Sequence, residues 1–505
     1  MSEPAAQAPV IRLHPDDNIL IALRPLAAGT QIGDIEARRD IPRAHKLAAA
    51  PIATGAPVIR YGQVIGQATA EIAPGDHVHS HNLGMAPHGT APASSQAPLP
   101  APGAPAFFDG YLRADGRVGT RNYLGVLTSV NCSGSVARFI AQRAEQSGLL
   151  DEFPGIDGIV PIVHGTGCGM AASGEGYETL MRVIRGYAAH PNFGGVLLVG
   201  LGCEVMQLAA LTTERMRADA NLKTLIIQDS GGTAATVAQG VAALREMAPA
   251  VDALRRTRQP ASMLVLGMQC GGSDGYSGIT ANPALGIASD LLVAQGGISI
   301  LSETPEIYGA EHLLTSRATS PEIAAKLMER IAWWEDYTAR NGGEMDNNPS
   351  PGNKRGGLTT ILEKSLGAVA KGGSAPLSGV YLYGEKITAP GFVFMDSPGY
   401  DPASVTGQIA SGANLIVFTT GRGSVSGYKP VPGLKLATNS EMYARLEGDM
   451  DLDCGDVIAQ GLPLEAKGRE IFELMLNAAS GARTKSERLG FGDAEFVPWQ
   501  IGAVM

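Results

Sequence analysis

Four of the five cysteines stand where apolar, β-branched runs of the sequence end. These are Cys132 after residues 123–130, Cys168 after 155–164, Cys203 after 195–202, and Cys270 after 263–268. Open parallel sheets bind ligands at the carboxyl ends of their strands, whereas packing cysteines are expected within strands and on helix faces. Thiolates at such an edge could bind iron or another soft or borderline metal, an iron–sulfur cluster included. A structural and a nucleophilic role stay open, because the spacings contain no local CxxC signature.

Other polar groups are expected on the same edge. His164 stands four residues before Cys168 in HGTGCG, where a buried core histidine is the plainer alternative. Glu303 and Glu306 lie in SETPE, and they either contribute to the site or begin a helix at Pro305. Asp274, in QCGGSDG, either binds metal or caps the following turn.

Three glycine-containing loops suit a small anion. NPSPGNKRGG (348–357) offers Lys354, TTGRGS (419–424) offers Arg422 and Ser424, and QDSGGT (228–233) precedes a helix. Helix N-termini and backbone N–H groups favour carboxylates. The sequence contains no Walker or Rossmann fingerprint, which disfavours ATP and NAD.

A histidine-rich segment, DHVHSHNL, ends the N-terminal part of the chain. Strand alternation would place His77, His79 and His81 on one face. The segment indicates either a metal or carboxylate site or a polar edge strand with solvated imidazoles.

The elements that must hold these residues alternate between strands and helices. Apolar runs also occur at 224–229 and 297–303, with helical patterns such as SVARFIAQRAEQ and YETLMRVIRGYAAH between runs. A second block contains GVYLYGE, GFVFMD, LIVFTTG and LKLATN, with helices near 358–370 and 462–480. Alternating elements predict βαβ units and mostly parallel sheets, so the fold class is α/β.

The chain divides into four parts. Residues 1–85 read as a small β-rich domain, because short apolar segments are broken by Pro and Gly. Residues 86–107 form a Pro/Ala-rich linker. An α/β domain over 108–258 and a C-terminal α/β domain over 259–505 follow.

Composition excludes several classes of protein. The chain of 505 residues is 44% hydrophobic and 17% charged, with a net charge of −10 and no basic run, so nucleic acid is not an expected partner. No apolar stretch reaches the ~20 residues that span a bilayer. The N-terminus lacks a signal-peptide plan, and five cysteines do not suggest a disulfide framework. We expect a cytoplasmic protein without a membrane partner.

Six longer motifs then carry a family resemblance. They are GYLRADGRVGTRNYLGVL (110–127), HPNFGGVLLVGLGCE (190–204), QCGGSDGYSGITANPALG (269–286), ILSETPEIYGAEHLL (300–314), NPSPGNKRGGLTTILEKSLG (348–367) and FTTGRGS (418–424). The chain resembles the altronate/galactarate dehydratase family over nearly its whole length. DNILIAL and DHVHSHNL resemble the SAF (β-clip) domain of these enzymes.

The resemblance implies a hydro-lyase that converts a sugar acid to a 2-keto-3-deoxy acid. A general base takes the C2 proton and an acid protonates the departing 3-hydroxyl. It also implies iron, as mononuclear Fe2+ or a labile iron–sulfur cluster, and a second divalent ion such as Mn2+ or Mg2+. A homodimer is the expected assembly.

Roles follow from the resemblance position by position. The expected metal ligands are Cys168, Cys203, Cys270 and Cys132, with His79 and His81 for a second ion. The expected catalytic residues are His164 as base or ligand, Glu303 as ligand or acid, and Lys354. The expected substrate contacts are Lys354, Arg422, Ser424, Ser273 and Asp274.

Two other functions remain open. One is a sulfo-lyase that releases sulfite from a sulfolactate-like hydroxy acid, and the other is a carboxylate-binding protein without turnover. The loop GSVSGYKPVP departs from the family pattern at Ser426, where a bulkier residue is expected. If that loop lines the pocket, it bears on the choice of substrate.

Overall fold

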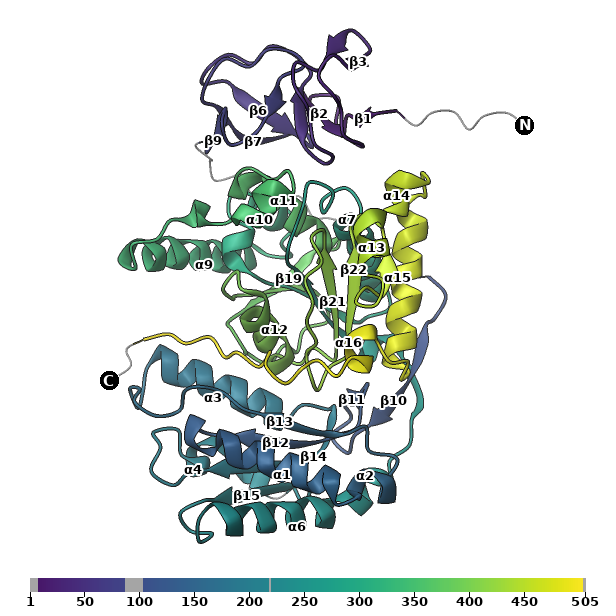
Figure 1. The fold of residues 1–505 in the computed structure, drawn as a ribbon. Helices are drawn as coiled ribbons and strands as arrows, with labels where there is room; N and C mark the ends of the chain where they lie inside the picture. The colour runs from purple at the N-terminus through teal and green to yellow at the C-terminus, as the bar shows by residue number, and fades with distance from the viewer. Residues whose placement is uncertain (1–7, 87–102, 218, 503–505) are drawn as a thin grey trace, which may run out of the picture.

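The computed structural model describes residues 8–86, 103–217 and 219–502, and the linker prediction falls mostly outside these ranges. Three bodies are stacked in Figure 1: a small β module at the top, the large C-terminal domain in the middle and the second domain at the bottom. The predicted fold class, α/β with a β-rich N-terminal region and parallel sheets, is confirmed.

The N-terminal module is built from short antiparallel strands. They form the sheets β1-β2-β5-β8, β6-β7-β9 and β3-β4. The strands are β1 (Val10–Ile11), β2 (Ile19–Ala22), β3 (Gln31–Ile32), β4 (Ile35–Glu36), β5 (Lys46–Ala48), β6 (Pro57–Arg60), β7 (Gln63–Ala68), β8 (His77–Val78) and β9 (Leu83–Gly84). Ile19 and Ile21 of β2 belong to the same hydrophobic core as the C-terminal domain, so the module packs on that domain.

The second domain has a four-stranded parallel sheet in the order β13-β12-β14-β15. Its elements are β12 (Tyr123–Thr128), η1 (Asn131–Ser133), α1 (Gly134–Gln146), α2 (Leu149–Glu152), β13 (Ile159–Ile162), α3 (Glu175–Ala188), β14 (Phe193–Gly200), α4 (Leu208–Leu211), α5 (Glu214–Arg217), β15 (Leu222–Ile226) and α6 (Thr233–Asp252). Successive residues of a strand point to opposite faces. Leu124 and Val126 therefore pack with α1 and α6, whereas Leu127 packs on the side of α3.

The C-terminal domain has a seven-stranded parallel sheet in the order β19-β20-β18-β17-β21-β22-β23. Its strands are β17 (Val265–Cys270), β18 (Ile298–Leu301), β19 (Leu377–Tyr381), β20 (Gly391–Met395), β21 (Leu415–Thr420), β22 (Gly433–Ala437) and β23 (Leu452–Asp453). Its α-helices are α7 (Ala281–Ala294), α8 (His312–Thr315), α9 (Pro321–Arg340), α10 (Pro351–Arg355), α11 (Ile361–Val369), α12 (Asp401–Ala410), α13 (Ser440–Arg445), α14 (Asp456–Ala459), α15 (Leu464–Ala479) and α16 (Lys485–Arg488). The 3-10 turns are η2 (Ala261–Met263), η3 (Thr304–Glu306), η4 (Met345–Asn347) and η5 (Ala370–Gly372).

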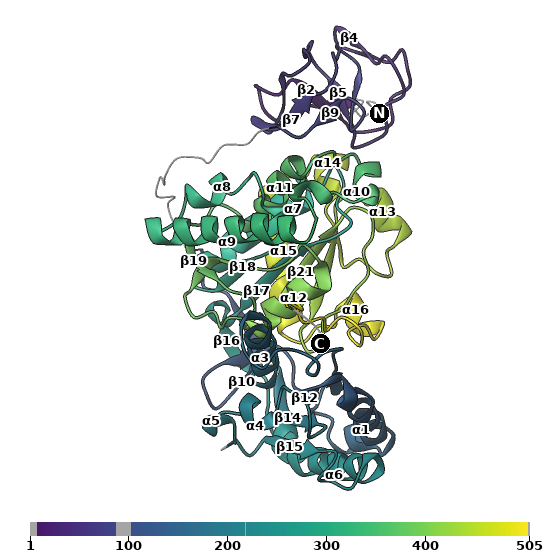
Figure 2. The ribbon, with the colours of Figure 1, turned by 90° about the vertical axis from the view of Figure 1, so that its left-hand side faces the viewer.

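A small antiparallel sheet, β11-β10-β16, lies where the chain enters and leaves the second domain. It joins β10 (Phe107–Leu112) to β11 (Val118–Gly119) and to β16 (Thr257–Pro260). Helix α3 of the second domain lies beside α12 of the C-terminal domain in Figure 1, and the two share one hydrophobic core. The turned view in Figure 2 shows the same vertical order of the three bodies.

In each parallel sheet the first strand has later strands on both of its sides. In the C-terminal sheet, β17 pairs with β18 on one side and with β21 on the other. In the second domain, β12 pairs with β13 on one side and with β14 on the other. Ligands of open α/β sheets bind outside the carboxyl ends of the strands at such switch points.

Candidate functional site

Cys270 lies at the switch point of the seven-stranded sheet. It is 2% exposed and is the last residue of β17. The sequence had suggested a position just after the strand, but the residue belongs to the strand itself. Gly271 comes next, and a Cβ at this position would approach an Asp401 Oδ2 to 2.1 Å. The glycine therefore leaves room for Asp401 beside the thiol.

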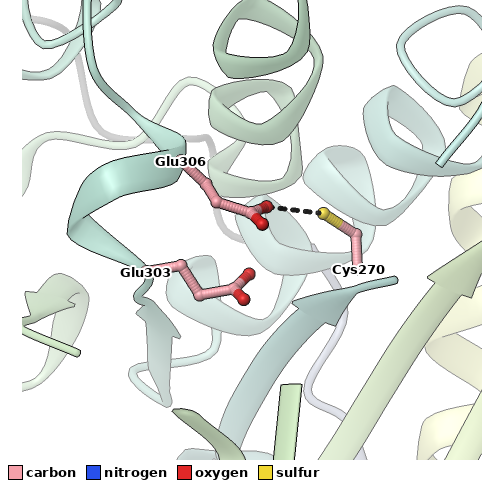
Figure 3. Close-up of side chains that lie close together, drawn as sticks. All are labelled: Cys270, Glu303 and Glu306. Atoms are coloured by element: carbon pink, nitrogen blue, oxygen red, sulfur yellow. Dashed lines mark hydrogen bonds between the residues drawn. The ribbon is translucent and has the colours of Figure 1, made fainter. Parts of the chain in front are cut away.

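Two glutamates reach the thiol from the neighbouring strand. Glu303 and Glu306 flank and end the turn η3 that follows β18. Figure 3 shows both carboxylates directed toward the Cys270 sulfur, with Sγ and a Glu306 Oε2 3.8 Å apart. One ligand atom from each of these three residues lies within 4.8 Å of the others.

Glu303 is held in an unusual state. Its φ of 72° is in the left-handed region, which non-glycine residues seldom occupy outside functional or strained sites. Both carboxyl oxygens are buried without a hydrogen-bond partner among the described residues. Burial, and next the charge of Glu306, raise the pKa of Glu303 well above its usual range. Burial therefore favours the neutral, protonated form of this side chain over the carboxylate.

Two buried lysines complete the group. The Lys371 ammonium lies 2.9 Å from the Cys270 sulfur and 3.8 Å from a Glu303 oxygen. The Lys364 ammonium donates to Glu306 at 2.5 Å and to Asn348 at 3.0 Å. We refer to Cys270, Glu303, Glu306, Lys364 and Lys371 as the buried cluster.

The electrostatics of the buried cluster favour acid–base chemistry. Burial raises the pKa of Cys270 to about 11, although Lys371 opposes this shift, so the thiol is neutral at pH 7. Asp401, at the start of α12, has its pKa raised to about 6 by burial and then by Glu306. A carboxyl with a raised pKa, Glu303, and a second one with a pKa of about 6, Asp401, suit proton transfer to and from a substrate.

The buried cluster is a poor match for an added divalent cation. Cys270 and Glu306 have the right donor atoms, but the ammonium of a lysine already contacts each of them. A cation there would be repelled by both ammonium groups and would require deprotonation of the thiol. The expectation that Cys270 binds iron is thus not the interpretation that this geometry favours.

The N-terminal module closes one side of the site. A small cavity beside Cys270 is also lined by Lys364 and by Arg60 and Tyr61 of the module. Arg60 and Lys46 both bind Glu363, which is the neighbour of Lys364 on α11. Burial would raise the pKa of Glu363, but the two cations outweigh it and lower this pKa to about 2.

The histidines of the module meet the C-terminal domain at α10. His79 lies 2.9 Å from the Lys354 carbonyl oxygen, and His45, which no sequence motif marks, lies 3.2 Å from that of Arg355. His45 and His77 have ring nitrogens 2.9 Å apart, whereas the His81 ring is 5.6 Å from that of His77 by ring centroid. No group of three histidine nitrogens within 4.8 Å occurs among the described residues. The expected ion at His79 and His81 stays an untested prediction.

The predicted substrate contacts lie around the loop that follows Cys270. A Cβ on Gly272 would be 3.0 Å from Ser424 Oγ and 3.2 Å from Arg422 Cβ. Arg422 is exposed and Lys354 half-buried, which leaves both able to meet a ligand. Ser273 is buried, and its carbonyl accepts a hydrogen bond from Asn353.

Asp274 caps the turn that follows it, which was the alternative to metal binding. It accepts hydrogen bonds from the Tyr276 N–H and from Ser277, Thr438 and Asn439. Its carboxylate therefore stabilises the turn and joins it to Thr438 and Asn439.

The other predicted residues lie on a different sheet. Cys132, Cys168 and Cys203 are exposed at the carboxyl edge of the four-stranded sheet, whereas Cys270 is buried in the seven-stranded one. The prediction that all four thiols lie on one sheet edge was wrong, because the sequence pattern does not reveal which strands share a sheet. Cys454 is buried as well.

His164 also belongs to the second domain. Its Nε2 lies 3.0 Å from the Thr128 carbonyl and its Nδ1 accepts from the Thr166 N–H. Burial lowers its pKa to about 4. With both nitrogens engaged, the ring is suited to hold the loop and not to take a proton from a substrate.

Sequence reasoning missed Lys364, Lys371 and Asp401. A signal for the lysines exists: α11 is buried along its whole length, so charges within ILEKSLGAV and just after it require partners. Asp401 gave no such signal, since an acidic residue at a helix start is ordinary.

These features define a multidomain α/β protein with a buried acid–base centre at the switch point of its larger sheet. The chain belongs to the D-galactarate/altronate dehydratase family. The SAF domain of altronate/galactarate dehydratases matches residues 8–86, the family's second domain matches 110–252 and its C-terminal domain matches 261–504. The predicted family is therefore confirmed.

Relatives of known name agree with this assignment. Altronate dehydratase of Bacillus subtilis (strain 168) is 35% identical over 491 residues, covering 95% of this chain and 97% of the relative. Galactarate dehydratase (L-threo-forming) of Escherichia coli (strain K12) is 37% identical over 495 residues, 95% and 94% of the two chains. (2R)-sulfolactate sulfo-lyase subunit beta of Chromohalobacter salexigens is 30% identical over 389 residues, covering 76% of this chain and 95% of the relative.

The dehydratases among these relatives are hydro-lyases by name, which supports the predicted enzyme class. In the described ranges, none of the helices has the length and apolar character needed to cross a bilayer.

Proposed function

We propose that this enzyme dehydrates a sugar acid of the altronate or galactarate type to a 2-keto-3-deoxy acid. The observation that carries the proposal is the buried cluster, which combines a proton donor, a nearby carboxylate and two ammonium groups in a chain of this family. The relatives named altronate and galactarate dehydratase support the substrate class.

The first step is removal of the C2 proton, and Asp401 is the proposed base. This replaces His164, whose nitrogens are already hydrogen-bonded. An Asp401 pKa of about 6 leaves the carboxylate free at neutral pH while keeping it basic enough to accept a proton. The rate should fall as pH drops below about 6, because protonated Asp401 cannot act as a base.

The negative charge formed on the substrate carboxylate needs fixed cations. Lys371 and Lys364 are buried and ammonium-bearing, so they stabilise this charge without reorganisation of water. The C2 hydrogen is only weakly acidic, which makes this stabilisation a large part of the task. Arg422 and Lys354 lie near the loop that follows Cys270, and they are the proposed contacts for the remote end of the acid.

Glu303 is the proposed acid that protonates the departing 3-hydroxyl. Its raised pKa provides the proton, and its two oxygens have no hydrogen-bond partner among the described residues. A substrate hydroxyl would supply that missing partner. The general acid thus comes from the sequence prediction, while the base does not.

The test is conversion of altronate and galactarate by the purified full chain, with the 2-keto acid detected as its semicarbazone. Asp401→Asn should lose turnover by about 10²–10⁴-fold and lose the acid limb of the pH profile. If the wild-type enzyme, supplied with ferrous iron, converts neither acid nor a related aldonate, the proposal is wrong. An unchanged pH profile in Asp401→Asn would remove Asp401 as the base.

A sulfo-lyase is the second candidate, favoured by the sulfolactate sulfo-lyase relative. Release of sulfite from sulfolactate would select it. Tight binding of a sugar acid without product would instead indicate a binding protein. A homodimer, a cytoplasmic location and a second ion such as Mn2+ or Mg2+ stay predictions from the sequence.

A further inference from the structure

Three exposed thiols gather on the second domain, away from the buried cluster. Cys132 follows β12, Cys168 follows β13 and Cys203 follows β14, and these three strands are neighbours in one sheet. All three are exposed, although free cysteine is among the most buried residue types. We refer to Cys132, Cys168 and Cys203 as the thiol edge.

The thiol edge occupies the ligand-binding position of its sheet. Strand β12 is the switch point, because the chain adds β13 on one side of it and then β14 on the other. Cys132 and Cys203 thus flank the crevice where ligands of open α/β sheets bind. Gln228, from the loop after β15, also reaches this edge and lies 3.5 Å from the Cys203 sulfur.

The loops that carry the thiols are hydrogen-bonded to one another. Buried Glu204 accepts from Ser129 at 2.7 Å and from the Gly202 N–H at 2.6 Å, which ties the Cys203 loop to the end of β12. The Asn131 N–H donates to the Thr166 carbonyl at 2.9 Å. The three thiols are therefore presented by one joined set of loops.

Gly167 shows how closely these loops approach. It has a φ of 100°, and a Cβ there would lie 2.2 Å from the Ser129 carbonyl oxygen. Its own carbonyl accepts from the Met206 N–H at 3.1 Å. The residue before Cys168 thus contacts both of the neighbouring loops, and only glycine fits.

Two long helices begin at the same edge without a side-chain cap. Helix α1 starts two residues after Cys132, and α6 starts after Gly231 and Gly232. Neither N-cap residue, Ser133 or Gly232, bonds its helix through a side chain. The positive end of each helix dipole favours an anionic group at this edge.

We propose that the thiol edge binds an iron–sulfur cluster through Cys132, Cys168 and Cys203. Thiolate ligands select soft metals and iron–sulfur clusters. A single ion needs ligand atoms that all lie within about 4.8 Å of one another. Among the described residues, the three sulfurs of the thiol edge do not form such a group. In a four-iron cluster each cysteine binds a different iron, so its cysteine sulfurs lie further apart than those around a single ion. With three cysteines, a four-iron cluster keeps one iron without a protein thiolate.

The test is reconstitution of the full chain with ferrous iron and inorganic sulfide under anaerobic conditions. Iron, acid-labile sulfide and visible charge-transfer absorption are measured on the wild type and on Cys132→Ala, Cys168→Ala and Cys203→Ala. The wild type should bind iron and sulfide in equal amounts, and each variant should lose most of both. Cys454→Ala and Cys270→Ala are the matched controls and should keep the cluster.

Several outcomes would overturn the proposal. These are a wild type without labile sulfide, iron bound without sulfide, retention of the cluster in all three single variants, and loss in Cys270→Ala alone. The three substitutions are at exposed positions, and thermal unfolding of the apo-variants shows whether each one folds. A variant that does not fold is replaced by the corresponding Cys→Ser. Because no turnover is measured, failure of this proposal is distinct from failure of the proposed dehydratase activity.

Discussion

The two parallel sheets of this enzyme carry cysteine at the same topological place with opposite surroundings. At the switch point of the large sheet, Cys270 is buried between Lys371 and Glu306. At that of the small sheet, Cys132 and Cys203 are exposed beside uncapped helix N-termini. The switch point gives only the place for a ligand, and the neighbouring charges decide its chemistry, which we propose to be proton transfer in one sheet and metal binding in the other.

The largest effect should come from Glu303, which tests whether the buried cluster is an acid–base centre. Glu303→Gln should lower kcat by about 10²–10⁴-fold, because the amide cannot protonate a leaving hydroxyl. Iron content should not change. The exposed Glu335→Gln on α9 is the control and should keep wild-type turnover.

Either of two results would break the contrast. Turnover of Glu303→Gln within a few-fold of wild type would remove this residue as the acid. Loss of iron together with turnover would make the buried cluster the metal centre, as the sequence had suggested for Cys270 and Glu303.

The next largest effect should be on stability, through the ion pairs that attach the SAF domain to the C-terminal domain beside the buried cluster. Glu363→Gln leaves Lys46 and Arg60 buried without their carboxylate, and breaking a buried pair costs about 3–5 kcal/mol. The control is Glu441→Gln, which removes the exposed carboxylate that pairs with half-buried Arg43 at the same interface and should cost less than about 1 kcal/mol. Thermal unfolding measures both, and equal losses would contradict the assigned role of Glu363.

Loss of Glu363 should also affect catalysis through its neighbour. Lys364 follows it on α11 and holds Glu306, so displacement of the helix should lower kcat more than it raises KM. The thiol edge should keep its proposed iron–sulfur cluster in this variant, since no described contact joins Glu363 to the second domain.

A smaller effect should appear on acidification. Burial lowers the pKa of His45 to about 4, below the value of 6.5 for the unfolded chain. Between these values the unfolded chain binds more protons than the folded one, so this contribution to stability is lost as pH falls from about 6.5 toward 4. Hydrogen exchange at α10 should therefore rise in this range, and less so in His45→Asn. Identical pH dependence in both proteins would exclude His45 as the cause.

Much of the fold could be predicted because the strands are short apolar runs with abrupt ends. The run at 263–268 corresponds to β17 and the run at 123–130 to β12. The division into two sheets could not be predicted, because strand order depends on crossovers that leave no periodic signal. Glu303 was found at its strand end, whereas Lys364 and Lys371 were missed because their partners lie 58 and 101 residues away in the chain.

The last prediction uses thiol reactivity to separate the two sheets directly. In the native, metal-free enzyme a thiol reagent should label three cysteines quickly, Cys132, Cys168 and Cys203, and two only after unfolding, Cys270 and Cys454. Burial raises the pKa of Cys270 to about 11, so this thiol is both shielded and protonated at pH 7. Reconstitution with iron and sulfide should protect the three fast thiols and leave the slow pair unchanged. Fast labelling of Cys270, or protection of Cys270 by iron, would mean that the two switch points share one chemistry and that the contrast between them is wrong.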